Sequence, residues 1–229
     1  MAPMTEAPGA RPQASDAVPK DYWLPMVLFG ALTLAESYLD PAWFPMAYIA
    51  KAVLVTAALL ALRRPYADLN YDRRTILPSV GLGLLVFALW IGIDKFVPYP
   101  HFGSRSAFDP TPLQGSALWP VFLAVRLYGL ALMVPVMEEI FWRSFLLRYL
   151  TRTDFESLAV GTFSAFALMV MVAASAVAHP EWLVAVLASL AYALWLRRSR
   201  SLFGAILAHS TTNAALGAYV LRTGEWQYW

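Results

Sequence analysis

The stretch LWPVFLAVRLYGLALMVPVMEEIFWRSFLLRYL, residues 118–150, decides how this chain folds. It is apolar over more than the roughly 20 residues that a helix needs to cross a bilayer core of about 30 Å. It nevertheless contains Glu138, Glu139 and Arg143 close together. Ionisable side chains are costly in hydrocarbon and usually mark a transport pathway or a reaction centre. The stretch therefore predicts a membrane-spanning helix that carries functional polar groups.

The composition of the whole chain is that of a membrane protein. Of its 229 residues, 59% are apolar and 14% are charged, and the mean hydropathy is +0.55. A soluble domain is about half apolar and about a quarter charged. The formal net charge of +2 gives no indication of nucleic-acid binding. Cysteine is absent, which excludes disulfides, thiolate nucleophiles and cysteine-ligated metals, and three histidines are too few for a His-rich metal cage.

We expect an all-α fold, a polytopic membrane helical bundle of seven or eight transmembrane helices. Residues 1–20, rich in Ala and Pro, predict a disordered N-terminal tail without a signal peptide. Residues 21–229 then form a single membrane domain. The seven apolar segments run over residues 22–39, 43–62, 76–97, 118–150, 158–179, 182–196 and 202–221.

Lysine and arginine are distributed unevenly between the two ends of these segments. If the N-terminus is cytoplasmic and the helices alternate, eleven of the seventeen lie on the cytoplasmic side. Three lie on the other side, and three lie within spans. This bias follows the positive-inside rule and predicts a multi-pass protein of the inner (cytoplasmic) membrane with a cytoplasmic N-terminus. The cytoplasmic set is Arg11, Lys20, Arg63, Arg64, Arg73, Arg74, Arg148, Arg152, Arg197, Arg198 and Arg200; the outer set is Lys95, Arg105 and Arg222; and Lys51, Arg126 and Arg143 fall within spans.

Two segments depart from a regular span. Pro135 removes a backbone donor, so we expect a kinked fourth span, with Glu138 in the first turn of its second piece and near the positive end of that helix dipole. The segment 182–196 covers only about 22 Å by helix rise. The turn His179-Pro180-Glu181 before it is therefore expected to lie recessed below the outer surface. Non-helical backbone at such depth must be buried in protein or line a wet cavity.

Four polar side chains from three predicted spans form the candidate reaction centre: Glu138, His179, His209 and Asn213. Helix rise places Glu138, His209 and Asn213 near the middle of the membrane and His179 nearer the outer side, and with helix tilt and unwinding all four can approach one cavity. A carboxylate can act as general base on a water, and a nearby imidazole can share the proton. His209 and Asn213 are four residues apart and share a helix face. Both can donate a hydrogen bond to a developing oxyanion.

Glu139 and Arg143 are expected to support this centre. Their spacing of four suits an intrahelical ion pair, and that pairing leaves Glu138 as the freer carboxylate. A purely structural interpretation is open for each motif taken alone: an ion pair, a turn histidine before a proline, or an interhelical hydrogen-bonding pair. The conjunction of the motifs favours the functional interpretation. Lys51 and Arg126 are expected to have structural roles.

These residues resemble the motifs of the CAAX-protease and bacteriocin-processing (Abi-type) family of intramembrane proteases. The family motif of two Glu, three variable residues and Arg matches residues 138–143, and its final motif, His with Asn four later, matches His209 and Asn213. Its middle motif, Phe, three residues and His, matches at His179 but has Ser175 at the Phe position. The resemblance covers residues 118–221, the expected catalytic core. It looks nearest to the bacterial "CAAX prenyl protease-related" branch, which is associated with exosortase-type sorting systems.

The resemblance implies a glutamate-dependent endopeptidase that needs no cofactor. Glu138 and His179 would activate a water, and His209 and Asn213 would stabilise the oxyanion. A zinc-dependent variant is the alternative, because one Glu and two His can hold zinc with an open position, although no His-Glu-x-x-His pair is present. The expected partners are a membrane-anchored protein or peptide substrate, the lipid bilayer and proteins of a sorting system.

Two other classes of function fit parts of the sequence. The departure at Ser175 suits a non-enzymatic membrane scaffold or partner of a sorting system. Intramembrane charges also mark ion pathways, so a small transporter is a third possibility. Many transporters are built from internal repeats, and no duplication is evident in this sequence. A flux assay would separate the transporter from the other two.

Overall fold

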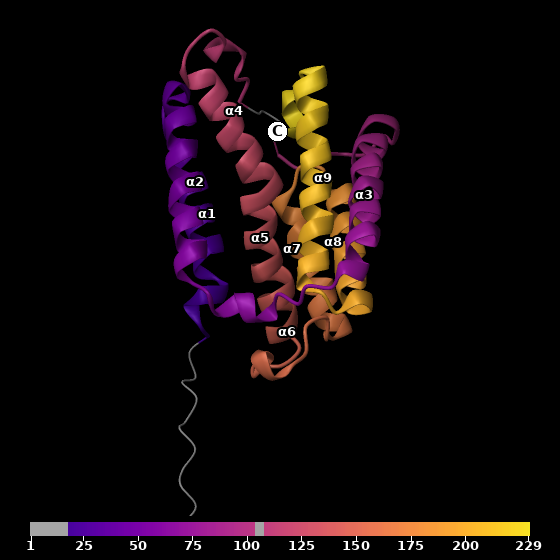
Figure 1. Ribbon diagram of the computed structural model, residues 1–229. Coiled ribbons are helices and arrows are strands. Elements are labelled where there is room, and N and C mark those ends of the chain that lie inside the picture. Colours follow the sequence, from indigo (N-terminus) through magenta and orange to yellow (C-terminus); the bar gives the residue numbers. More distant parts are fainter. Residues whose placement is uncertain (1–17, 104–107) are drawn as a thin grey trace, which may run out of the picture.

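The computed structural model describes residues 18–103 and 108–229, and within these ranges the chain is helical and contains no β-strand. Helices occupy each of the seven predicted segments (Figure 1). The segments Pro41–Ala61, Arg73–Phe96 and Leu118–Tyr149 are long and apolar enough to cross a membrane. The chain is a polytopic membrane helical bundle, as the sequence predicts. Its helices are α1 (Leu24–Glu36), α2 (Phe44–Ala61), α3 (Ile76–Phe96), the rod of α4 (Leu118–Tyr128), α5 (Val134–Glu138) and α6 (Leu147–Tyr149), and then α7 (Ala165–Ala178), α8 (Trp182–Ser199) and α9 (Leu202–Thr223).

Most of the predicted N-terminal tail, including Arg11, lies outside the described residues, as does Arg105. The described part of the tail, residues 18–20, leads into a 3-10 turn, Lys20–Tyr22. The Tyr22 ring is only 3% exposed and packs edge-on against the Phe155 ring at 5.0 Å. The chain is thus anchored to the bundle immediately before α1.

The rod of α4, α5 and α6 changes its helical period on both sides of Pro135. Residues Gly129–Met133 and Glu139–Leu146 are π-helical, and such turns are frequent at functional sites. The backbone between them stays right-handed helical, and the N–H of Glu139 donates to Pro135 O and Val136 O. The expectation that Glu138 begins a second helical piece is therefore wrong. Glu138 lies inside continuous helix, where no free N-terminal dipole is available to it.

Two predicted boundaries are also wrong. The fifth helix, α7, begins at Ala165 instead of residue 158, because Ser164 caps it by accepting a hydrogen bond from the Ala167 N–H. Residues 158–164 form a loop, and Gly161 adopts a φ of +82° against the Leu196 carbonyl, where a Cβ would lie 2.6 Å from that oxygen. The sixth helix, α8, runs to Ser199 and so has 18 residues, enough for about 27 Å by helix rise.

The turn of residues 179–181 is covered by protein, although the helix after it is not short. The Phe102 N–H donates to Pro180 O at 3.1 Å, and the Trp182 indole N–H donates to Pro100 O at 2.7 Å. Glu181 is 7% exposed. The segment around residues 100–102 therefore lies over the turn, which accounts for non-helical backbone at this position.

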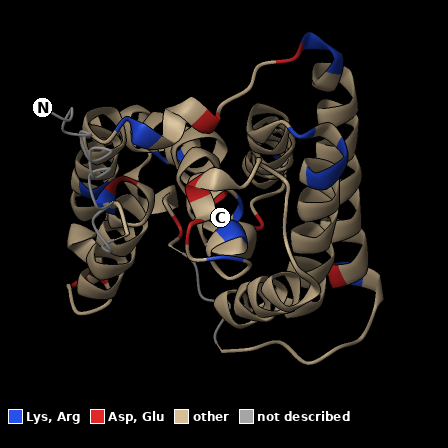
Figure 2. Cartoon of the chain, turned by 90° about the horizontal axis from the view of Figure 1, so that it is seen from below, with Lys and Arg blue, Asp and Glu red and all other residues tan. Residues whose placement is uncertain are grey.

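The helices alternate in direction, and the loops at one end of the bundle are strongly basic. At this end the Arg64 guanidinium pairs with the Glu156 carboxylate at 2.5 Å, and Arg148 pairs with Asp68. Arg200 Nη1 donates to Thr162 Oγ1 at 2.7 Å. Figure 2 looks onto this end. These contacts join residues 62–75, 149–164 and 197–201, and we call this end the basic end.

Helix α9 packs against α3, α8 and the rod of α4, α5 and α6 (Figure 1). Its contact with α3 depends on Gly83, because a Cβ there would lie 2.6 Å from Thr211 Cβ and would also collide with the Ala208 carbonyl. At this crossing the Thr212 hydroxyl donates to Gly83 O at 2.8 Å. Small residues let membrane helices approach closely and interact through packing and hydrogen bonds. The crossing fixes the part of α9 that carries His209 and Asn213.

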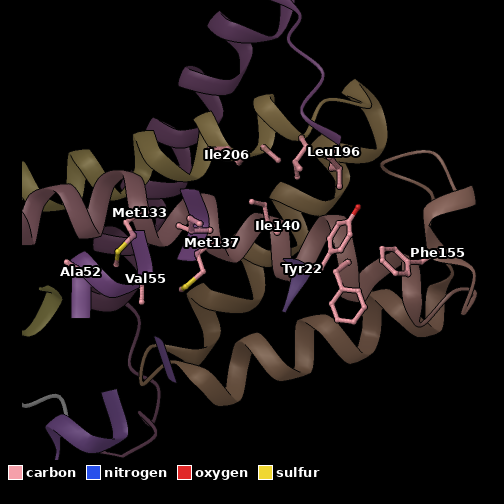
Figure 3. Packing of buried hydrophobic residues seen from close by; sticks show 13 residues of the cluster. Tyr22, Ala52, Val55, Met133, Met137, Ile140, Phe155, Leu196 and Ile206 are labelled. Atoms are coloured by element: carbon pink, nitrogen blue, oxygen red, sulfur yellow. The ribbon is translucent and has the colours of Figure 1, made fainter. Parts of the chain in front are cut away.

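The largest apolar cluster of the described residues lies on one face of the rod of α4, α5 and α6 (Figure 3). Met133, Met137 and Ile140 follow helical spacing and pack between α2, represented by Val55, and α9, represented by Ile206. Each of the three is at most 2% exposed. Since Met137 and Ile140 face this cluster, the side chain of the intervening Glu138 points away from it.

Candidate active site

The two adjacent carboxylates of the rod, Glu138 and Glu139, have different surroundings. Consecutive residues of a helix point about 100° apart. The Glu139 side chain is 0% exposed and is enclosed between the rod and α9. The Glu138 side chain is half-buried and lines a cavity between the helices. In residues 18–103 and 108–229, no hydrogen bond or ion pair engages the Glu138 carboxylate. Glu138 is therefore the carboxylate that is accessible for chemistry.

Glu139 joins the rod to α9 through two charged partners. Its Oε1 lies 3.0 Å from Arg143 Nη1, which confirms the predicted intrahelical pair, and 2.9 Å from His209 Nδ1. An ionised carboxylate can only accept hydrogen bonds, so the His209 Nδ1–H donates. The second oxygen, Oε2, is buried without a partner among the described residues. The contact to Glu139 orients the imidazole and leaves its Nε2 for the cavity.

Tyr192 of α8 completes the support of His209. Its ring stacks on the His209 ring with centroids 5.2 Å apart and an interplanar angle of 20°. The Arg143 guanidinium lies over the same tyrosine ring at 5.6 Å. The Tyr192 hydroxyl donates to Thr212 Oγ1 at 2.7 Å. Tyr192 was missed by sequence reasoning, because an apolar helix gives no signal for a stacking partner on another helix.

Asn213 lies one turn after His209 on α9 and also reaches the cavity. Its Nδ2 donates to the Leu130 carbonyl at 2.9 Å, in the first π-helical stretch of the rod. A carboxamide has two N–H donors, so one remains for a ligand. The hydrogen bond to Leu130 fixes the direction of that second donor.

His179 reaches the cavity from the turn between α7 and α8. Its Nδ1 lies 2.9 Å from Ser175 O. Because a carbonyl can only accept, Nδ1 carries the proton, and Nε2 of the neutral ring keeps a lone pair. The Trp90 ring of α3 packs edge-on against the imidazole at 5.9 Å. The hydrogen bond of His179 to residue 175 uses a backbone oxygen, so Ser in place of Phe does not remove it. Trp90, which the sequence did not indicate, supplies an aromatic neighbour for the imidazole.

One cavity collects the four residues that the sequence singled out. Its volume is about 490 Å³, and its walls include Glu138, His179, His209 and Asn213. Arg143 also reaches the wall, whereas Glu139 lies behind it. The other walls are largely apolar and come from α4, α7, α8 and the C-terminal residues Gln227, Tyr228 and Trp229. The arrangement places a free carboxylate, two imidazoles and an amide around one space in which a peptide group and a water can meet.

The described residues around the cavity lack the usual grouping of metal ligands. Within the described ranges no three His, Asp or Glu side chains are grouped as metal ligands. The Arg143 guanidinium lies 3.0 Å from Glu139 Oε1, and a neighbouring cation opposes the binding of a second positive charge.

Comparison with known proteins bears on this site. Residues 119–215 match the family model described as type II CAAX prenyl endopeptidase Rce1-like. No curated protein and no solved structure shows significant similarity to the chain. The matched range contains all six residues of the predicted site, from Glu138 to Asn213. The match does not distinguish the exosortase-associated branch of the family from its other branches. The match confirms, for residues 119–215, the predicted resemblance to the CAAX-protease family of membrane endopeptidases.

Proposed function

We propose that this chain is an intramembrane endopeptidase in which Glu138 activates a water to hydrolyse a peptide bond of a membrane-anchored protein or peptide. The proposal rests on the contrast between the two carboxylates. Glu139 is paired with Arg143 and His209, whereas Glu138 faces the cavity without a partner among the described residues. Unpaired intramembrane carboxylates are costly and are retained where they have a function.

In the proposed reaction, the Glu138 carboxylate accepts a proton from water while the water oxygen attacks the scissile carbonyl carbon. The carbonyl oxygen becomes an oxyanion, which accepts hydrogen bonds from the second Asn213 N–H and from His209 Nε2–H. Since His209 Nδ1 already donates to Glu139, this role requires an imidazolium, whose charge Glu139 compensates. Collapse of the intermediate breaks the C–N bond, and the proton held by Glu138 passes to the leaving amine.

His179 acts with Glu138 on the attacking water in this proposal. Its lone pair on Nε2 can accept the second hydrogen bond of that water, because the Ser175 carbonyl holds the proton on Nδ1. Two acceptors that share one water orient its oxygen toward the carbonyl carbon.

The mechanism needs no metal, and the lack of a group of three His, Asp or Glu ligands among the described residues supports that choice over the zinc variant. We expect purified active protein to contain less than stoichiometric zinc and to keep its activity in a membrane-compatible chelator. Metal content measured on the same sample provides the check. Stoichiometric zinc that is lost together with activity would favour the alternative.

The position of the cavity supports substrate entry from the end of the bundle opposite the basic end. Its walls include Phe44 at the start of α2, Phe108, and Trp229, all at the end of the bundle opposite the basic end. With a cytoplasmic basic end and a cytoplasmic N-terminus, substrates reach the cavity from the non-cytoplasmic side of the inner membrane. A substrate or partner protein of a sorting system would meet the enzyme there.

The experiment that tests the function replaces Glu138 by Gln. This substitution keeps shape and removes the base, so cleavage should fall by a factor of about 10² to 10⁴. The termini of membrane-anchored proteins would be mapped by mass spectrometry in cells that express the wild-type chain, Glu138→Gln, or no copy. A terminus that depends on the wild-type chain and is lost in Glu138→Gln identifies a substrate.

Glu156→Gln is a suitable control, since Glu156 pairs with Arg64 at the exposed basic end. It should leave the termini of the wild type unchanged. If the termini change on deletion of the chain but not in Glu138→Gln, the chain acts as a scaffold and the proposed mechanism is wrong.

A further inference from the structure

Arg126 of α4 is half-buried and differs from the buried cations of the described helices. Three cations are at most 4% exposed, and each has a carboxylate partner. No carboxylate lies within ion-pair distance of Arg126 in the part of the chain that the structure describes. Its Nε is fully buried and has no hydrogen-bond partner there. The three compensated pairs are Lys51 with Glu36, Arg143 with Glu139, and Arg148 with Asp68.

Aromatic rings surround the Arg126 guanidinium. It lies 4.4 Å from the Tyr48 ring centroid and 6.0 Å from those of Phe44 and Trp229. The negative face of an aromatic ring attracts a cation at such distances. These contacts compensate part of the charge, but ring faces do not satisfy the five N–H donors of a guanidinium. The rings therefore hold the group in place while its donors still lack an anion.

Arg126 lines the same cavity as Glu138. The two residues are twelve positions apart on one rod, which corresponds to about 18 Å by helix rise. An extended peptide covers about 3.3 Å per residue, so the span equals about five residues, and fewer after the reach of both side chains. A short peptide segment can thus contact both ends of the cavity at once.

We propose that Arg126 is an anion-binding subsite that holds the terminal carboxylate of the substrate and thereby sets which peptide bond reaches Glu138. The proposal rests on the proposed endopeptidase function and adds a determinant of its specificity. The planar guanidinium matches a carboxylate through two parallel N–H to O hydrogen bonds. The substrate then lies with its carboxyl end toward the entrance of the cavity, and the leaving peptide is the segment between Arg126 and the scissile bond.

A peptide carboxylate fits this place better than a lipid phosphate. Tyr48 is 3% exposed, and Phe44 and Trp229 are half-buried, so rings separate the guanidinium from the surrounding lipid. A lipid phosphodiester would have to carry its acyl chains past these rings. A peptide that already occupies the cavity delivers its carboxylate from within.

Binding of a defined probe tests the subsite without any cleavage. The probe is a fluorescent N-palmitoylated hexapeptide of Ala, Leu and Val, made as the free acid and as the C-terminal amide. The protein is the full chain with Glu138→Gln in phosphatidylcholine nanodiscs. We expect the acid to bind about tenfold more tightly than the amide, the ratio given by about 1.4 kcal/mol of charge-assisted hydrogen bonding. Adding Arg126→Gln should reduce this ratio to about one, and Arg126→Lys should retain part of it.

Arg222→Gln serves as the matched control, because Arg222 is an exposed cation at the same end of the bundle. It should keep the full ratio. Equal binding of acid and amide to the parent protein, absence of saturable binding of the acid, or an unchanged ratio in Arg126→Gln overturns the subsite. Phosphatidylglycerol that displaces the acid only when Arg126 is present assigns the site to lipid phosphate instead. If the ratio depends on Arg126 but wild-type protein cleaves nothing in cells, the subsite stands and the proposed function fails.

Discussion

The two halves of the long rod treat their charges differently. Toward the basic end, Arg143 and Arg148 are buried and paired, with Glu139 and Asp68 as partners. Toward the opposite end, Arg126 and Glu138 line a cavity and have no ion-pair partner among the described residues. Both halves belong to one continuous helix with the same apolar background.

This difference separates structural charges from charges available to a ligand. Taking an ion out of water costs several kcal/mol, and a membrane-embedded charge survives only if a partner, water or a ligand compensates it. In the basic half the compensation comes from the protein itself. In the other half it must come from the contents of the cavity. Stability is therefore expected to depend on the first half and turnover on the second.

The largest effect on stability is expected at Glu139. Glu139→Ala leaves the buried Arg143 without its carboxylate and removes the acceptor of His209. Breaking a buried pair from one side costs about 3–5 kcal/mol. Glu138→Ala should leave the free energy of unfolding nearly unchanged. Thermal unfolding of the purified proteins in the same detergent checks both, and equal destabilisation by the two substitutions would abolish the distinction between the halves.

A smaller loss of stability is expected for a substitution where α9 crosses α3. Gly83→Ala forces a Cβ against Thr211 and the Ala208 carbonyl, so α9 must move away from α3. Overpacking of this kind costs about 1–3 kcal/mol. Because His209 follows Ala208 directly, activity should fall by more than the loss of folded protein accounts for.

Gly81→Ala is the matched control, since its Cβ would meet nothing within 4 Å. Both variants would be compared in unfolding temperature and in cleavage of the same substrate at equal amounts of folded protein. A Gly83→Ala protein with wild-type turnover would show that the crossing does not position the site.

The contacts that the sequence predicted are those set by helix geometry alone. The spacing of Glu139 and Arg143 fixes their pairing, and that pairing identifies Glu138 as the free carboxylate. The seven helical segments follow from long apolar runs. The start of α7 was missed, because residues 158–160 are apolar and the positive φ of Gly161 depends on the neighbouring end of α8.

Contacts between distant helices were not predictable from one sequence. The contact of His209 Nδ1 with Glu139, seventy positions away, was not predicted. Trp90 and Tyr192 lie in apolar helices whose composition suits lipid as well as a ring partner. The expected structural role of Arg126 gave no hint that it lines the cavity. In each case the partner depends on how helices are arranged around α9.

The smallest loss of stability is expected when an ion pair outside the bundle core is removed. This case provides a contrast with the buried pairs. Glu225 follows α9, and its Oε1 lies 2.6 Å from Lys95 Nζ and 2.8 Å from the Tyr219 hydroxyl. The hydrogen bond from Lys95, and then that from Tyr219, hold the pKa of the Glu225 carboxyl below its usual range. A carboxyl whose pKa is lower in the folded state adds stability above its unfolded pKa of about 4.3, and that stability is lost as the pH falls through the folded pKa. Glu225→Gln should therefore lower the unfolding temperature slightly at pH 7 and not at all once the pH is well below 4.3. Because both side chains are partly exposed, added salt should shrink the difference in unfolding temperature between Glu225→Gln and the wild type at pH 7. The loss of stability in Glu139→Ala should persist in salt. A Glu225→Gln effect as large and as salt-resistant as that of Glu139→Ala would contradict the assignment of stability to the buried half of the rod.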